Sequence, residues 1–111
     1  MPTKTAELTN YIQFIEDGAR LKGNIASIAY DVDVSGELYT SGNPKAPAYR
    51  LFAKSPRGRP VEIGGLWKKQ NRANADYYTL SINTGFGKLN ANLGRYPGQD
   101  DEDFMAIISW D

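Results

Sequence analysis

The chain has 111 residues, of which 41% are hydrophobic and 12% aromatic, and its 13 Lys and Arg residues balance its 13 Asp and Glu residues. This composition excludes a disordered tail and suffices for a packed core, so we expect one all-β domain over residues 1–111. The chain has no histidine and no cysteine, which excludes Ser-His-Asp and Cys-His catalysis, disulfides and ordinary zinc sites; we expect no enzyme activity and no cofactor.

The N-terminal stretch shows no targeting signal. Residues 1–10, MPTKTAELTN, lack the apolar core of a signal peptide, and no apolar run approaches the roughly 20 residues that a membrane helix needs. We therefore expect a cytoplasmic protein without a membrane partner, in which residues 1–9 form a flexible N-terminal segment.

Short extended runs, separated by Gly, Pro, Asn and Asp, follow one another along the chain. Residues 4–16, KTAELTNYIQFIE, fit a short helix about as well as a strand, and the other runs read as strands. Strands are expected near residues 10–16, 19–28, 29–34, 48–54, 61–69, 76–83, 88–93 and 104–110. Seven or eight short antiparallel strands predict a single small barrel or sandwich with little helix, and we favour an OB-like barrel.

Several runs alternate in the manner of half-buried strands. Tyr78, Leu80 and Ile82 share one face of the run YYTLSI, and its other face is more polar. In KLNANL, residues 88–93, the leucines and alanine alternate with Lys and Asn. This period of two predicts which side chains form the core.

The run 48–54, AYRLFAK, places an aromatic ring between two cations on one strand face. Arg50, Phe52 and Lys54 share this face, an arrangement that stacks a base while it neutralises phosphates. Alternatively, Phe52 belongs to the core and the two long side chains extend around it into solvent. Arg57 and Arg59, in the loop KSPRGRP that follows, suit phosphate contact or a solvated loop equally.

A second candidate lies in the hairpin EIGGLWKKQNRANADYYTLSIN, residues 62–83. If Trp67 is exposed, it forms a stacking and charge site with Lys69 and Arg72 at the hairpin tip. If Trp67 is buried, it is a large core residue and the lysines mark the strand leaving the core. The sequence leaves both interpretations open.

Charge is unevenly distributed along this neutral chain. Residues 44–75 contain eight Lys and Arg residues and one acidic residue, Glu62. Such a chain can still present a strongly positive face. Among the acids elsewhere, Asp31 and Asp33 lie two apart on a strand, and residues 100–103 read DDED; we interpret both as solvated carboxylates and expect no metal site.

The ordered motifs APAYRLF, VEIGGLWKK, DYYTLSI, LNANL and AIISW resemble the domain of unknown function 736 family over residues 48–110. The strongest correspondence covers 62–64 and 67–69, followed by 76–77 and 91–93. The chain departs from the family pattern at Ala48, at Gly65-Leu66 and at Asn83-Thr84-Gly85. The resemblance implies a small protein carried on conjugative or integrative elements of proteobacteria, and no reaction.

Two functional hypotheses follow. The first is binding of single-stranded nucleic acid, with DNA favoured, through a basic face interleaved with aromatic rings. Its expected contact residues are Arg50, Phe52, Lys54, Arg57, Arg59, Trp67, Lys68, Lys69, Arg72 and Tyr77. The alternative is a protein–protein interaction module, such as an accessory or counter-defence protein, that has no nucleic-acid contact; the balanced charge favours it. The oligomeric state is left open.

Overall fold

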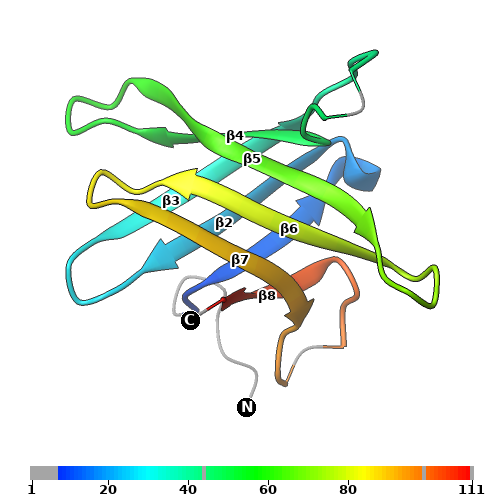
Figure 1. Ribbon diagram of the computed structural model, residues 1–111. Helices are drawn as coiled ribbons and strands as arrows, with labels where there is room; N and C mark the ends of the chain where they lie inside the picture. The colour runs from blue at the N-terminus through cyan, green and yellow to red at the C-terminus, as the bar shows by residue number, and fades with distance from the viewer. Residues whose placement is uncertain (1–7, 44, 99, 111) are drawn as a thin grey trace.

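The computed structural model describes residues 8–43, 45–98 and 100–110, and it contains eight strands that form one closed barrel (Figure 1). This confirms the predicted all-β barrel of seven or eight short strands. The strands are β1 (Tyr11–Ile15), β2 (Arg20–Ala26), β3 (Asp31–Leu38), β4 (Tyr49–Lys54), β5 (Pro60–Gln70), β6 (Asp76–Asn83), β7 (Lys88–Arg95) and β8 (Phe104–Ser109), with a short 3-10 turn η2 (Glu16–Gly18) between β1 and β2.

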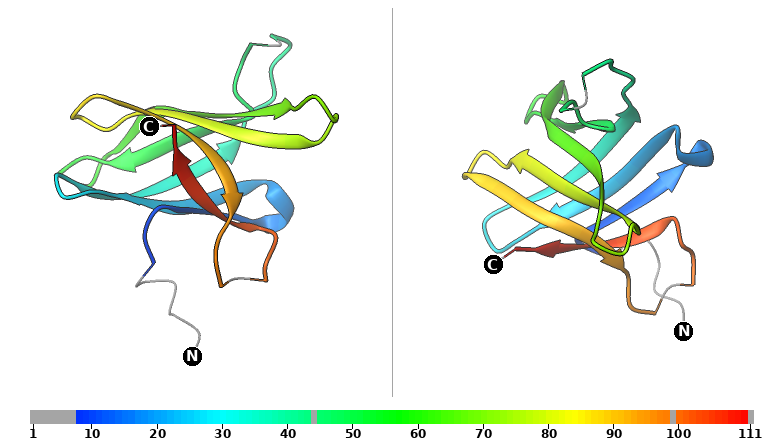
Figure 2. Two further views of the ribbon diagram at one scale, coloured as in Figure 1. Left: turned by 60° about the horizontal axis from the view of Figure 1, so that its bottom comes forward. Right: turned by 45° about the vertical axis from the view of Figure 1, so that its right-hand side comes forward.

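Each strand pairs antiparallel with its neighbours in the chain, and β8 pairs with β1 to close the barrel (Figures 1 and 2). An OB fold is a five-stranded Greek-key barrel, whereas this order is an up-and-down meander of eight strands. The predicted small barrel is therefore confirmed, and its strands follow an up-and-down order instead of the Greek-key order of an OB fold. Closure gives each of these strands a paired neighbour on both sides, which removes a route to aggregation.

The strand limits differ from expectation mainly at β3, which was expected to end at residue 34. The pair Ser35-Gly36 reads as a turn, but Gly36 pairs with Leu21 on one side and with Leu51 on the other. A Cβ atom on Gly36 would lie 2.8 Å from Leu21 and 2.9 Å from Leu51. Gly36 therefore makes room for two core leucines and does not end the strand.

The N-terminal expectations fall partly outside the described residues. Residues 1–7, most of the predicted flexible segment, are not described by the structure. Thr9 does have a tertiary contact, since its carbonyl accepts a hydrogen bond of 3.2 Å from the Tyr96 hydroxyl. Where the sequence fitted a helix or a strand, residues 11–15 form β1.

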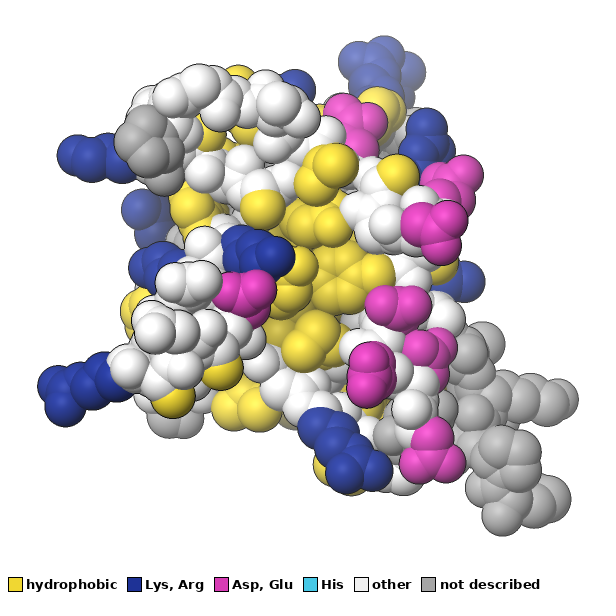
Figure 3. All heavy atoms as spheres, turned by 90° about the vertical axis from the view of Figure 1, so that its right-hand side faces the viewer, with side chains coloured by type: hydrophobic (Ala, Val, Ile, Leu, Met, Phe, Trp, Pro, Cys, Tyr) yellow, Lys and Arg dark blue, Asp and Glu magenta, His cyan; other side chains and the backbone are white. Residues whose placement is uncertain are grey.

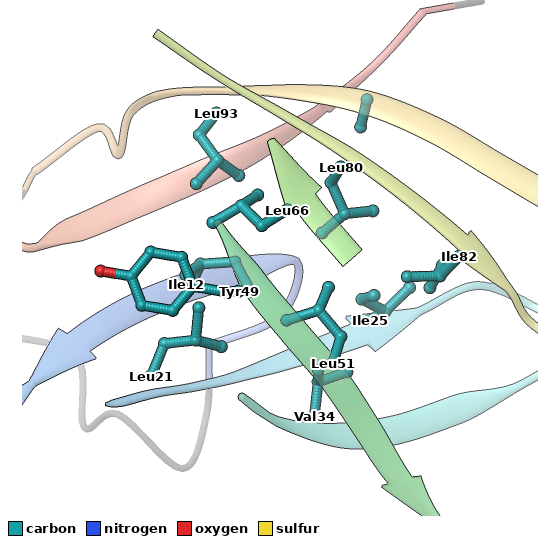
Figure 4. Packing of buried hydrophobic residues seen from close by; sticks show 11 residues of the cluster. Ile12, Leu21, Ile25, Val34, Tyr49, Leu51, Leu66, Leu80, Ile82 and Leu93 are labelled. Atoms are coloured by element: carbon teal, nitrogen blue, oxygen red, sulfur yellow. The ribbon is translucent and has the colours of Figure 1, made fainter. Parts of the chain in front are cut away.

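The core fills the inside of the barrel with branched aliphatic side chains. The largest fully buried ones come from β1, β2, β4, β5 and β6 and point toward one another (Figure 4): Ile12, Leu21, Ile25, Leu51, Leu66 and Leu80. The predicted alternation is confirmed in β6, where Leu80 and Ile82 are buried and Tyr78 packs against the cluster. Burying one such side chain contributes about 1.5–3 kcal/mol, so the buried cluster to which these six belong is a large stabilising contribution.

The barrel has two open ends with different surroundings (Figures 1 and 2). One end, here called the three-turn mouth, carries the turns 27–30, 55–59 and 84–87. The other, here called the hairpin mouth, carries η2, the β3–β4 loop (39–43 and 45–48), the β5–β6 turn (71–75) and the β7–β8 loop (96–98 and 100–103). In the part of the chain that the structure describes, no helix is long and apolar enough to span a membrane.

Candidate nucleic-acid interface

The ten predicted contact residues lie on β4, β5, β6 and the two turns that join them, but they form separate groups. Five belong to the β5–β6 hairpin: Trp67, Lys68, Lys69, Arg72 and Tyr77. Three belong to the β4–β5 turn region at the opposite mouth: Lys54, Arg57 and Arg59. Because β5 has 11 residues, the turns at its two ends are up to about 33 Å apart, which separates the two groups.

The register of the β5–β6 hairpin decides which side chains share its outer face. Trp67 pairs with Thr79, and Lys69 pairs with Tyr77, which places these residues outward. Lys68 pairs with Tyr78 on the row that faces the barrel interior, and its Nζ lies 3.3 Å from an Asp76 carboxylate oxygen. Of the two adjacent lysines, Lys69 is therefore the one on the outer face.

Lys69 and Arg72 keep their positive charge available to a ligand. Both side chains are exposed, and neither forms an ion pair with any of the described residues. Arg72 lies in the turn, where the Asn71 side-chain oxygen accepts hydrogen bonds from the backbone N–H groups of Ala73 and Ala75 at 2.9 and 3.1 Å. The Asn71 side chain thus holds the turn, and no ion pair of Arg72 with a described residue is needed for it.

Trp67 is neither a core residue nor a fully exposed ring. It is half-buried, and its indole Nε1–H donates a hydrogen bond of 3.0 Å to the carbonyl of Lys45 in the β3–β4 loop. A Cβ atom on Gly65 would lie 2.7 Å from Pro47 and 3.1 Å from the Trp67 ring. The missing side chain therefore lets the β3–β4 loop and the indole ring pack closely against β5. Trp67 therefore fastens the β3–β4 loop to the barrel and exposes only part of its ring.

Arg50 is committed to an ion pair. Its Nε and Nη2 donate hydrogen bonds of 3.0 and 2.8 Å to the two carboxylate oxygens of Glu62. The Arg50 guanidinium also lies over the half-buried Phe52 ring, 5.4 Å from its centroid, and 5.6 Å from that of Tyr39. The hydrogen bond from Arg50 lowers the pKa of Glu62, so the pair stays ionised at neutral pH. Arg50 and Phe52 thus form an internally neutralised cluster between the two groups of cations.

The β4–β5 turn presents its cations freely. The Ser55 backbone N–H donates to the Arg59 carbonyl at 2.8 Å, the Ser55 hydroxyl accepts from the Arg59 N–H at 3.1 Å, and Gly58 takes a φ of +80°. Arg57 and Arg59 are exposed, and within the described ranges neither they nor Lys54 form an ion pair. This turn is therefore a second cationic group.

The hairpin mouth contains an aromatic cluster that sequence reasoning did not assemble. The Phe14 ring lies 5.4 Å from that of Tyr49 and 5.2 Å from that of Tyr78, centroid to centroid. The Tyr49 hydroxyl donates to the Gly18 carbonyl at 2.5 Å, and burial, with smaller contributions from Tyr78 and Asp103, raises the Tyr49 pKa. The alternating pattern of β6 predicted that Tyr78 points inward. It could not predict the contact of Tyr78 with Phe14 of β1 and Tyr49 of β4, because these strands face one another only in the closed barrel.

Figure 3 looks into this mouth and shows a hydrophobic floor with charged side chains around it. In this view acidic side chains gather on one side and basic ones mainly on the other. Two elements of this mouth are rich in acidic residues, since η2 contains Glu16 and Asp17 and the β7–β8 loop contains Asp101 to Asp103. Most of the basic side chains seen around this mouth thus lie on one side of the hydrophobic floor, across from the acidic ones.

The paired carboxylates of β3 have a structural partner. The Asn24 side-chain amide donates hydrogen bonds of 2.7 Å to Asp31 and 3.3 Å to Asp33. Among the described residues, no group of three or more acidic, His or Cys side chains is arranged to hold a metal ion. Asp31 and Asp33 therefore fix the β2–β3 pairing.

Comparison with known proteins gives a family and no function. Neither a curated protein nor a solved structure matches the chain. A family model described as "Protein of unknown function (DUF736)" matches residues 11–110, which is the whole barrel. The chain therefore belongs to this family of proteins of unknown function.

Proposed function

We propose that this protein binds single-stranded nucleic acid, DNA in preference, through the outer face of the β5–β6 hairpin. The residues concerned, here called the hairpin strip, are Trp67, Lys69, Arg72 and Tyr77. The observation that carries the proposal is the pairing of Lys69 with Tyr77 on this face, beside an Arg72 whose charge, like that of Lys69, has no acidic partner among the described residues.

The hairpin strip has the two elements that sequence-tolerant binding of a single strand requires. Tyr77 and the exposed part of Trp67 supply ring surface, and stacking one base on an aromatic ring contributes about 1–3 kcal/mol. Lys69 and Arg72 neutralise phosphates on either side of the stacked base. Binding of this kind weakens with salt and shows little sequence preference.

The second cationic group extends the proposal to longer strands. Lys54, Arg57 and Arg59 lie at the far end of β5 from the hairpin turn, with the neutralised Arg50–Glu62 pair between. A short oligonucleotide reaches only the hairpin strip, whereas a longer one reaches both groups, so affinity should rise with length. The proposal includes a cytoplasmic, mobile-element setting in which DNA passes between cells as a single strand.

The test is a fluorescence-anisotropy titration of labelled oligothymidylate at about 50 and about 200 mM salt. We expect saturable binding at low salt that weakens steeply at high salt. The double variant Lys69→Gln/Arg72→Gln should bind about tenfold more weakly at low salt and lower the salt slope by about 1.4, the value for two lost phosphate contacts.

A matched control has the same change of charge elsewhere. Lys22 and Lys88 are exposed and lie on other parts of the barrel, so Lys22→Gln/Lys88→Gln should bind like the wild-type protein. An equal loss of affinity in the control variant would show that net charge alone causes the effect. Absence of binding at low salt would contradict the proposal.

A protein partner is the second candidate, and an exposed apolar pair favours it. Ile108 and Trp110 are 53% and 59% exposed and both point outward at the end of β8, where the Trp110 indole donates to the Asn92 side chain at 3.0 Å. Rigid aromatic and aliphatic side chains of this kind act as hot spots in protein interfaces. A photo-crosslinker at position 108, compared with one at position 22, should capture a discrete partner in cells if this candidate holds.

A further inference from the structure

We propose that the three-turn mouth is a second binding site, which takes a small amphipathic carboxylate with a straight aliphatic body. The inference concerns the opposite end of the barrel from the hairpin strip and does not depend on nucleic-acid binding. It rests on an apolar cleft, on the cations at its rim, and on apolar side chains that the turns leave in solvent.

The cleft lies between the end of β4, the start of β5 and the end of β6, and has a volume of about 670 Å³. That volume falls within the range of small-molecule sites, which often occupy the mouths of β-barrels. Its wall is aliphatic, formed by Val32, Ala53, Val61, Ile63 and Ile82. An aliphatic chain is the ligand body that matches this wall.

A β-bulge brings one of these side chains into the cleft. Leu51 pairs with Gly64 and Phe52 pairs with Glu62, so the register skips Ile63. Such an extra residue bends the strand and redirects its own side chain. Ile63 accordingly packs against the core while it lines the cleft, which makes the bulge part of the site.

The uncharged polar groups at the rim are already hydrogen-bonded. The Asn83 side-chain oxygen accepts from the Gly85 N–H at 2.9 Å, and the Thr84 hydroxyl donates to the Gly87 carbonyl at 3.0 Å. The Ser55 hydroxyl accepts from the Arg59 N–H. These bonds hold the turns in shape and engage the Asn83 side-chain oxygen and the Thr84 hydroxyl.

The charge at the rim selects an anion. Among the described residues that line the cleft, Glu62 is the only acidic one, and Arg50 donates two hydrogen bonds to its carboxylate. Lys54 also lines the cleft, and Arg57 lies in the adjoining turn. Neither side chain forms an ion pair within the described part of the chain. A carboxylate head beside Lys54 would complement this charge.

The turns around the cleft expose apolar surface that a short anion would leave uncovered. Phe86 is 72% exposed and its ring stacks on that of Tyr30 at 5.8 Å, Val61 is 47% exposed, and Ile28 is fully exposed. Exposed apolar surface gathered at one place marks a binding site more often than isolated residues do. The ligand should therefore carry an aliphatic body as well as a carboxylate.

The experiment is calorimetric titration of the full chain with octanoate and decanoate, kept below their micelle concentrations. We expect one saturable site, with decanoate bound about fifteenfold more tightly than octanoate, because each of its two extra methylenes strengthens binding about fourfold when buried. Decanol, which has the same body without the charge, should bind more weakly than decanoate.

Two variants locate the site. Lys54→Gln should weaken decanoate binding about tenfold and leave decanol unchanged, whereas Lys69→Gln, at the other mouth, should change neither. Val61→Trp should fill the cleft and abolish binding; since Val61 is half exposed, the fold should tolerate it, and the thermal midpoint verifies this. If it does not fold, Ala53→Leu is the second cleft-filling variant.

The proposal is overturned if decanoate shows no saturable binding, or if Lys54→Gln and the folded cleft-filling variant bind it as the wild-type protein does. Competition with oligothymidylate separates this site from the hairpin strip. Decanoate should not displace an oligonucleotide short enough to reach only the strip, and displacement would place both ligands at one site.

Discussion

Gly64 shows how a single residue without a side chain makes the barrel possible. A Cβ atom at Gly64 would lie 2.0 Å from the Ser81 carbonyl oxygen and 2.8 Å from the Ile82 Cα. Both are backbone atoms of the paired strand β6, so they cannot move aside as a flexible side chain would. The close approach of β5 and β6 beside the bulge therefore requires glycine.

We predict that Gly64→Ala destabilises the protein by at least about 3 kcal/mol, since overpacking against backbone distorts the ladder. Urea denaturation monitored by tryptophan fluorescence measures the change. Gly42→Ala is the control, because a Cβ atom there meets nothing within 4 Å, and it should be close to neutral. Equal stability of the two variants would contradict the role assigned to Gly64.

The Glu62 carboxylate gives a prediction for pH. The hydrogen bond from Arg50 lowers the pKa of Glu62 in the folded state, so this interaction stabilises the fold above the pKa of the unfolded chain, about 4.3. The contribution is lost as the pH falls through the folded pKa. Glu62→Gln should thus lower the urea midpoint at about pH 7, and the difference should shrink by about pH 3.

Glu102 supplies the matched control for this carboxylate, because it is exposed and forms no ion pair with the described residues. Glu102→Gln should leave the urea midpoint nearly unchanged at both pH values. A Glu62→Gln effect that persists undiminished in acid would show that charge pairing is not its cause.

At the scale of the element, the β5–β6 hairpin has two roles: it forms part of the barrel wall, and it holds the β3–β4 loop against that wall. The loop is held by the hydrogen bond from the Trp67 indole to the Lys45 carbonyl, together with the close contact of Pro47 with the Gly65 backbone. The sequence left Trp67 either buried or exposed. Its half-buried position follows from the loop, which covers the ring only once β4 and β5 have paired.

We predict that Trp67→Ala frees the β3–β4 loop and speeds tryptic cleavage after Lys45 about tenfold, while Trp67→Phe has a smaller effect because it loses the hydrogen bond and keeps a ring. Cleavage after Arg57, in the β4–β5 turn, serves as the internal reference and should not change. Equal cleavage rates after Lys45 in all three proteins would show that the indole does not hold the loop.

At the scale of the whole molecule, the seam between β1 and β8 is the weakest part of the closed barrel. Three residue pairs join these strands, whereas seven join β2 to β3 and seven join β5 to β6. The seam is reinforced by the Tyr11 ring, which stacks on Phe104 at 4.7 Å, and by the Ile107 N–H, which donates to the Asn10 carbonyl at 2.9 Å.

We predict that the seam amides of β1 and β8 exchange with solvent faster than those paired between β5 and β6, because fewer hydrogen bonds must open. Tyr11→Ala should increase this difference and cost about 3–5 kcal/mol in stability, the range for removing a buried aromatic ring. Hydrogen exchange followed by mass spectrometry measures both. Uniform exchange over all eight strands would contradict a weak seam.

The amino-acid sequence by itself determined the strands and most of the core, because both follow from local patterns. Alternation with a period of two predicted which side chains of β6 and β7 point into the barrel, and Gly, Asn and Asp predicted most of the turns. The same residues cannot show closure of the barrel, since the β1–β8 pairing joins segments about ninety residues apart in the chain.

Only the tertiary structure decided which cations are available and where. The Glu62 carboxylate offsets the charge of Arg50 because β4 and β5 pair in one register. The other predicted contact cations divide between the two mouths because the 11-residue strand β5 separates them. The apolar cleft that Lys54 lines and the aromatic cluster of the hairpin mouth likewise arise where several strands meet. Contacts between strands depend on register and closure, and these properties belong to the whole barrel rather than to any one segment.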